Sequence, residues 1–132
     1  RQGRLEVMDA IAWGRERLGP RLEIRRRLGS VAVHPTCGGR HIGLDRPLRA
    51  LAGELAHDVH VPPSATCCGF AGDRGFLHPE LTQAATREEA AEVGSRSFDA
   101  YVSSNRTCEI GLERATGERY VHVVQLLEEL TR

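Results

Sequence analysis

The chain has 132 residues and a mass of 14.5 kDa, which is the size of a single domain. Its 18 basic residues balance its 18 acidic residues, so its net charge indicates neither nucleic acid nor an anionic membrane as a partner. No apolar run is long enough to span a bilayer, and the absence of lysine excludes Schiff-base and Walker-type lysine chemistry.

Residues 1–28 are expected to form a leading helical segment. Apolar side chains recur there at helical spacing, and they are Leu5, Met8, Ile11, Ala12 and Leu18. Gly19-Pro20 ends this pattern. Because the chain begins at Arg1 and its only methionine is Met8, we also expect it to be a piece of a longer protein.

The rest of the chain alternates short strands with helices. Strands are expected at residues 30–34, 58–61, 100–103 and 120–122. Helices are expected at residues 48–55, 81–96, 105–115 and 123–130, with Asp45, Pro79 and Asn105 suited to their N-terminal turns. This alternation predicts an α/β fold, in which a small, open and mostly parallel sheet of about four strands is covered by helices.

The four cysteines follow the ends of predicted strands. Cys37 lies in a loop after the first strand, and Cys67 and Cys68 follow the second. Cys108 falls in the first turn of the helix after the third strand, where a helix N-terminus favours the thiolate that binds metals. The C-terminal ends of parallel strands lie along one edge of a sheet, where ligands bind. We therefore expect the four thiols to converge on one metal site.

The order of these cysteines resembles the cysteine-rich CCG domain. The runs HPTC, CCGFAGDRGFLHPEL and SSNRTCEIG carry the resemblance over about residues 30–125, and Cys67-Cys68-Gly69 is its most specific element. This family occurs in heterodisulfide reductase B subunits, in glycolate oxidase iron–sulfur subunits and in the C subunit of anaerobic glycerol-3-phosphate dehydrogenase. It also closes FAD-linked oxidases of the D-lactate dehydrogenase type, which these runs resemble most.

The resemblance implies an iron–sulfur domain that passes electrons from a flavin to a quinone or a cytochrome. The whole chain would be one CCG domain at the C-terminus of a larger flavoprotein, with FAD-binding and ferredoxin-like portions upstream. That parent enzyme would oxidise a D-2-hydroxy acid such as lactate, and the domain would not be catalytic by itself. We expect it in the cytoplasm, either free or peripheral at the inner face of the membrane.

The family pattern implies which residues surround the cofactor. Its fuller motif has a fifth cysteine where this chain has Asn105, so four thiols remain, one for each iron of an ordinary 4Fe-4S cluster. Asn105 is also a good helix cap, which is the interpretation that we prefer. Gly69 belongs to the central motif, and Arg74 either donates to a sulfide or a bound anion or pairs with Asp73.

Two histidines near the cysteines have ordinary structural explanations. His34 precedes Pro35 at a strand end, and we expect it to be structural, with metal ligation or tuning of a cluster as the alternative. His78 is expected to cap the helix that begins at Pro79. The glycine-rich run GFAGDRG lacks the spacing of nucleotide-binding loops.

Two other functions use the same thiols. Four thiolates satisfy the coordination of a structural zinc ion, although zinc ligands usually come in close pairs of the Cys-x-x-Cys kind, which this chain lacks. A thiol–disulfide relay would cycle two of the cysteines between dithiol and disulfide, again without a Cys-x-x-Cys motif. The spacing favours the iron–sulfur cluster over both alternatives.

Overall fold

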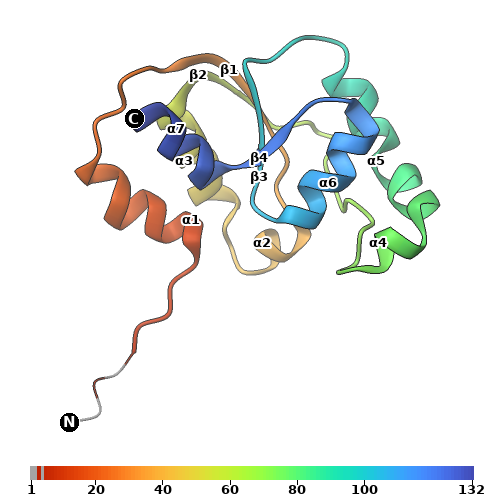
Figure 1. Cartoon of the computed structure of the whole chain (residues 1–132), viewed down its shortest axis with the longest axis horizontal. Helices are drawn as coiled ribbons and strands as arrows, with labels where there is room; N and C mark the ends of the chain where they lie inside the picture. The colour runs from red at the N-terminus through yellow and green to blue at the C-terminus, as the bar shows by residue number, and fades with distance from the viewer. Residues whose placement is uncertain (1–2, 4) are drawn as a thin grey trace.

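The structure is a computed structural model that describes residue 3 and residues 5–132 (Figure 1). Its centre is a four-stranded sheet in which all neighbouring strands are parallel. The strands are β1 (Leu28–Val33), β2 (Ala56–His60), β3 (Ala100–Ser103) and β4 (Tyr120–His122), in the spatial order β2-β1-β3-β4. The expected small parallel sheet is confirmed, and its first two strands begin two residues earlier than predicted.

Helices cover both faces of the sheet, as Figure 1 shows. The first face carries α1 (Ala10–Trp13), its π and 3-10 continuations (Gly14–Leu18 and Gly19–Arg21), α3 (Asp45–Leu55) and α7 (Val123–Thr131). The second face carries α5 (Pro79–Val93) and α6 (Arg106–Thr116). Two short helices, α2 (Cys37–His41) and α4 (Arg74–Leu77), follow the C-terminal ends of β1 and β2.

The alternation of side chains along β1 explains the two layers. Val31 and Val33 point into a large apolar cluster with the leucines of α3 and α7, whereas Ala32 packs in a second cluster with Leu112 of α6 and Tyr120 of β4. All of these side chains are buried. The second half of β1, residues 31–33, is buried on both faces and is a continuous apolar run, as is usual for an inner parallel strand.

The leading helix is shorter than the sequence pattern suggested. It begins at Ala10, because the Asp9 side chain accepts a hydrogen bond from the backbone N–H of Ile11 and caps it there. Leu5 and Val7 lie before this cap in extended backbone and are 91% and 93% exposed. Leu5 belonged to the predicted helical pattern, but it is exposed and lies outside the helix that forms.

Strand order fixes where a ligand can bind. The chain runs from β1 outward to β2 and then returns past β1 to β3, so the connections after β1 and β3 leave the sheet on opposite sides. In open parallel sheets, the C-terminal edge at such a reversal is where ligands usually bind. Cys37 and Cys108 follow these two neighbouring strands.

Candidate functional site

The four cysteines line one cavity of about 410 Å³ at the C-terminal edge of the sheet. They come from three connections: Cys37 after β1, Cys67 and Cys68 after β2, and Cys108 after β3. The cavity therefore contains all four of the expected thiols.

Cys37 begins a short helix instead of lying in a loop as predicted. Thr36 is extended, and its hydroxyl oxygen accepts a hydrogen bond from the Gly39 N–H at 3.0 Å, which caps α2. The residue pair Pro35-Thr36 ends strand pairing, and the cap then allows a single helical turn. The thiol of Cys37 is exposed at the start of that turn.

The turn after Cys67-Cys68 depends on Gly69. Its φ of +71° lies in the left-handed region. A Cβ atom at this position would stand 2.8 Å from both the Leu81 carbonyl oxygen and the Ala85 side chain of α5, so only glycine fits. The Gly69 N–H donates to the Cys67 sulfur at 3.4 Å. The adjacent cysteines diverge, with Cys67 exposed and Cys68 buried.

Cys108 meets Cys68 inside the wall of the cavity. The side-chain oxygen of Asn105 accepts a hydrogen bond from the Thr107 N–H at 3.0 Å and caps α6. Cys108 therefore lies in the first turn of α6, as expected. The Cys68 and Cys108 sulfurs lie 3.0 Å apart, close enough for a hydrogen bond but not for a disulfide. The contact joins the two thiols in a hydrogen bond.

The charges of the thiols are strongly unequal. Hydrogen bonding with the Cys108 thiol lowers the pKa of Cys68 to about 6, with smaller contributions from the Phe70 N–H and the His34 charge. The same hydrogen bond, together with burial, raises the pKa of Cys108. For Cys67, the Gly69 N–H lowers the pKa, but burial and the neighbouring thiols Cys37 and Cys68 outweigh it and raise the pKa overall. A pKa of about 6 favours the thiolate form of Cys68 at neutral pH.

The other residues that the sequence indicated differ in whether they lie at the cavity. Asn105 lines the cavity as well as capping α6. Arg74 is exposed on α4, is not among the residues that line the cavity, and forms no ion pair with Asp73 in the described chain. Gly69 acts through the backbone N–H that it donates to Cys67.

The histidines have different surroundings. His34 is buried and its Nδ1 atom lies 2.9 Å from both carboxylate oxygens of Glu89, so it has the structural partner that we expected. His78 occupies the position before Pro79 but makes no capping hydrogen bond, which corrects that prediction. Its Nδ1 atom instead lies 3.2 Å from the carboxylate of Glu80, in the first turn of α5.

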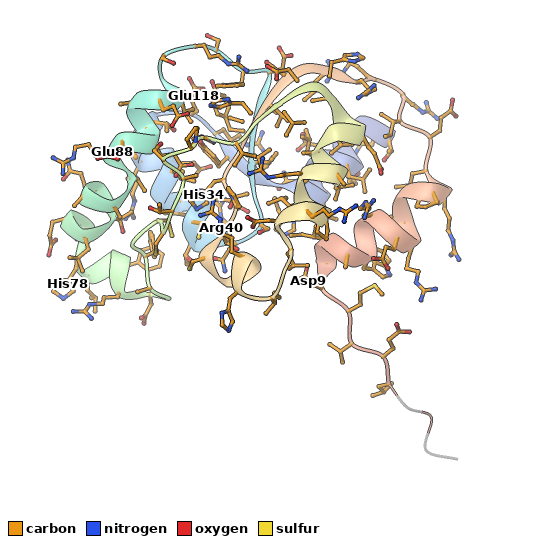
Figure 2. The ribbon with its side chains drawn as sticks, turned by 180° about the vertical axis from the view of Figure 1, so that it is seen from behind. Asp9, His34, Arg40, His78, Glu88 and Glu118 are labelled. Carbon is orange, nitrogen blue, oxygen red and sulfur yellow. The ribbon has the colours of Figure 1, made fainter. Side chains whose placement is uncertain are left out.

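Several cavity residues escaped the sequence reasoning, among them two from the start of the first helix. Asp9 and Ile11, at the start of α1, also line the cavity beside the thiols. Figure 2 shows Asp9 at the beginning of that helix, next to α2. They are far from the cysteines in sequence and have no motif, so only the packing of α1 against the first face of the sheet brings them there.

The donor set fits a group larger than one ion. In the described residues, no three or more histidine, cysteine, aspartate or glutamate side chains are gathered tightly enough to hold a single metal ion. The thiols instead surround a space of about 410 Å³, and soft sulfur ligands of this kind suit iron–sulfur clusters.

Comparison with known proteins assigns the family. The model of the CCG cysteine-rich domain matches residues 31–113, which contain all four cysteines. The chain belongs to this family. It is also similar to lactate utilization protein A from Oceanobacillus iheyensis, with 28% identity over an aligned length of 107 residues; the match covers 75% of this chain and 44% of that protein. The chain thus spans less than half the length of this relative. No solved structure matches it.

No helix among the described residues has both the length and the apolar character needed to cross a membrane.

Proposed function

We propose that this CCG domain holds a 4Fe-4S cluster on Cys37, Cys67, Cys68 and Cys108 and transfers electrons through it. The observation that carries the proposal is the convergence of four thiols from three connections on one cavity. When bound, such a cluster would accept and release single electrons. The chain supplies the thiolates and excludes solvent from the two inner ones, because Cys68 and Cys108 are 4% and 5% exposed.

The unequal burial of the thiols suits electron transfer. Cys67 and Cys37 are exposed, so the side of the cavity that they form is open to a partner. Electron transfer requires close approach between donor and acceptor, whereas the buried side protects the group from water. We infer that partners dock over the cavity mouth near these two cysteines.

The substrate context is also a proposal. The name of the similar protein places it in lactate utilization. This supports a role for the present chain in oxidation of lactate or a related 2-hydroxy acid. We further propose, from the family resemblance, that the chain is one domain of an FAD-linked dehydrogenase, with flavin and ferredoxin-like portions upstream and a quinone or cytochrome as acceptor.

A zinc site would need a different arrangement of the same thiols. Four sulfurs at about 2.3 Å from one tetrahedral zinc ion lie within about 3.8 Å of one another. Cys68 and Cys108 lie closer than this, at 3.0 Å, but no three of the cysteines in the described residues form a group that could hold one metal ion. The cavity volume therefore favours the multi-iron cluster.

A thiol–disulfide relay is the second candidate, because one observation favours it. Cys68 favours the thiolate form at neutral pH and lies 3.0 Å from the Cys108 sulfur. Loss of two electrons and the remaining proton to a disulfide-containing oxidant would join these sulfurs. Burial of both sulfurs opposes the role, since the oxidant must reach one of them.

Metal analysis separates the three functions. Protein purified and reconstituted without oxygen is assayed for iron, zinc and acid-labile sulfide, with absorption spectra before and after dithionite. The proposal expects about four irons and four sulfides per chain, by the composition of the cluster, and a visible band that bleaches on reduction. Stoichiometric zinc without sulfide would refute it. A disulfide between Cys68 and Cys108, found by mass spectrometry in metal-free protein with no iron uptake, would favour the relay.

Single substitutions test whether the thiols form one site. Cys37→Ser and Cys67→Ser should each abolish stable binding of the cluster, although both residues are exposed and contribute little to folding. Ser104→Ala is the matched control, because it changes a cavity residue that has no ligand chemistry in the proposal. Full iron and sulfide retention in Cys67→Ser would contradict the one-site arrangement.

A further inference from the structure

A buried aromatic ring packs with the two inner thiols. Phe70 lies in the connection between β2 and α4, is 0% exposed, and belongs to one apolar cluster with Cys68 and Cys108. Both cysteines line the thiol cavity, whereas Phe70 is not among the residues that line it. The ring therefore packs with the inner pair without facing the cavity.

Two glycines confine this ring. A Cβ atom at Gly75 of α4 would lie 2.7–2.9 Å from three atoms of the Phe70 ring, and one at Gly111 of α6 would lie 3.3 Å from it. The Gly75 N–H also donates a hydrogen bond to the Phe70 carbonyl oxygen at 2.8 Å. The ring is thus held close to the backbone of both helices, because neither position carries a side chain.

An outer layer separates Phe70 from solvent. Phe76 of α4 is 53% exposed, and its ring packs edge-on against that of Phe70, with the ring centres 4.8 Å apart and the planes at 83°. The Arg114 guanidinium of α6 lies 5.6 Å from the Phe76 ring centre and 5.9 Å from the Phe70 ring centre. Phe70 therefore lies between the inner thiols and a half-exposed surface.

We propose that Phe70 is a positioning residue of the thiol site, which fixes Cys68 and Cys108 and keeps water from their sulfurs on the buried side. Packing carries the inference, because the ring is fully buried, confined by two helices and part of the same cluster as the thiols. Close-packed interiors admit water only where removal of a side chain leaves a space. The shielding follows from the packing alone, whereas its effect on electron transfer rests on the proposed function.

Shielding should lower the reduction potential of the proposed cluster. Reduction adds negative charge, which water stabilises better than an aromatic ring does. Solvent exposure is accordingly one of the factors that set the potentials of iron–sulfur clusters. Phe70 therefore favours the oxidised form, and loss of its ring should shift the potential to a more positive value.

Alkylation of metal-free protein tests the shield without the cofactor. Labelling of Cys68 and Cys108 by iodoacetamide is followed by mass spectrometry, with rates corrected for the globally unfolded fraction found by urea unfolding. Leu112→Ala is the matched control for Phe70→Ala, because Leu112 is equally buried but belongs to a different cluster. The inner thiols should react faster in Phe70→Ala than in Leu112→Ala. Equal corrected rates would overturn the inference.

Gly75→Ala moves the ring without removing it, so it keeps the test decisive if Phe70→Ala does not fold. Its new methyl group must displace the Phe70 ring, whereas a Cβ at Gly53, a glycine of α3, would meet nothing within 4 Å. The inner thiols should therefore react faster in Gly75→Ala than in Gly53→Ala. Equal rates, or wild-type protein in which the inner thiols react as fast as the exposed Cys67, would also overturn the inference.

Reduction potentials of reconstituted protein test the effect on electron transfer. The potential of Phe70→Ala should be more positive than that of the wild type, and Leu112→Ala should match the wild type. A Phe70→Ala variant that binds the cluster at the wild-type potential would overturn this effect. Wild-type protein that takes up no iron and sulfide would instead overturn the proposed function, while the labelling rates still decide whether Phe70 shields the thiols.

Discussion

Replacement of Gly69 by alanine tests how the fold holds the central cysteine pair. Gly69 and Gly72 have similar left-handed backbones, with φ of +71° and +74°. They differ in their surroundings, because a Cβ at Gly72 would meet nothing within 4 Å, whereas one at Gly69 would lie 2.8 Å from the Leu81 carbonyl oxygen. Gly72→Ala is therefore a control for the backbone effect alone.

The magnitudes follow from these contacts. A left-handed backbone costs an alanine about 1–2 kcal/mol, and the lower freedom of the unfolded chain offsets about 0.4–1 kcal/mol of this. Gly72→Ala should thus lower the free energy of unfolding by about 1 kcal/mol. At Gly69, insertion of a methyl group against the α5 backbone adds about 1–3 kcal/mol, for a total of about 2–4 kcal/mol.

Urea unfolding followed by circular dichroism measures both variants. Equal losses of stability in Gly69→Ala and Gly72→Ala would refute the view that close contact with α5 fixes this turn. Iron uptake adds a second readout, because a shifted turn displaces Cys67 and Cys68 from the cavity. Gly69→Ala should bind less iron per folded chain than Gly72→Ala.

Three further predictions concern stability and thiol chemistry. Asn105→Ala should lower the free energy of unfolding by about 1 kcal/mol through loss of the α6 cap while iron and sulfide are retained, and loss of iron in folded protein would mark Asn105 as part of the cofactor site. Hydrogen bonds from the hydroxyl and the N–H of Ser64 lower the pKa of the Glu92 carboxylate below its ordinary 4.5. The ionised carboxylate therefore stabilises the folded protein above pH 4.5, and this stabilisation is lost as the pH falls through the lower pKa of the folded state. In urea unfolding, the free energy of unfolding of the wild type should therefore fall more than that of Glu92→Gln between pH 6 and pH 3, approximately the range of that titration. Parallel plots of the unfolding free energy against pH for the two proteins would contradict this assignment. In metal-free protein, alkylation at neutral pH should modify the exposed Cys37 and Cys67 first and Cys68 slowly despite its low pKa, as followed by mass spectrometry; fast labelling of Cys68 would show that burial does not protect it.

Much of the fold is readable in the sequence because its signals are local. The spacing of Leu48, Leu51 and Leu55 and the short valine-rich strands are patterns within one element, so they predict each element without knowledge of its neighbours. Alternation of the elements then predicts a parallel sheet. The convergence of the thiols follows from that topology, since the C-terminal ends of parallel strands share one edge.

Local patterns failed where a backbone hydrogen bond competed with them. The apolar spacing that begins at Leu5 predicts a helix from that residue onward, but the Asp9 cap makes the helix begin at Ala10. Likewise, Pro35 indicates a loop around Cys37, whereas the Thr36 hydroxyl adds a helical turn there. Each of these outcomes depends on one side chain and a few tenths to about 2 kcal/mol of capping energy, which periodicity does not contain.

The sequence by itself determined the order of the strands and helices, the membership of four cysteines in one site and the family resemblance, because these depend on spacing along the chain. Only the tertiary structure decided which thiols are buried, that Cys68 and Cys108 are hydrogen-bonded, and that His34 pairs with Glu89 across 55 positions. The physical reason is that burial, pKa and hydrogen-bond partners are set by what packs against a side chain. Those neighbours come from elements that are distant in sequence.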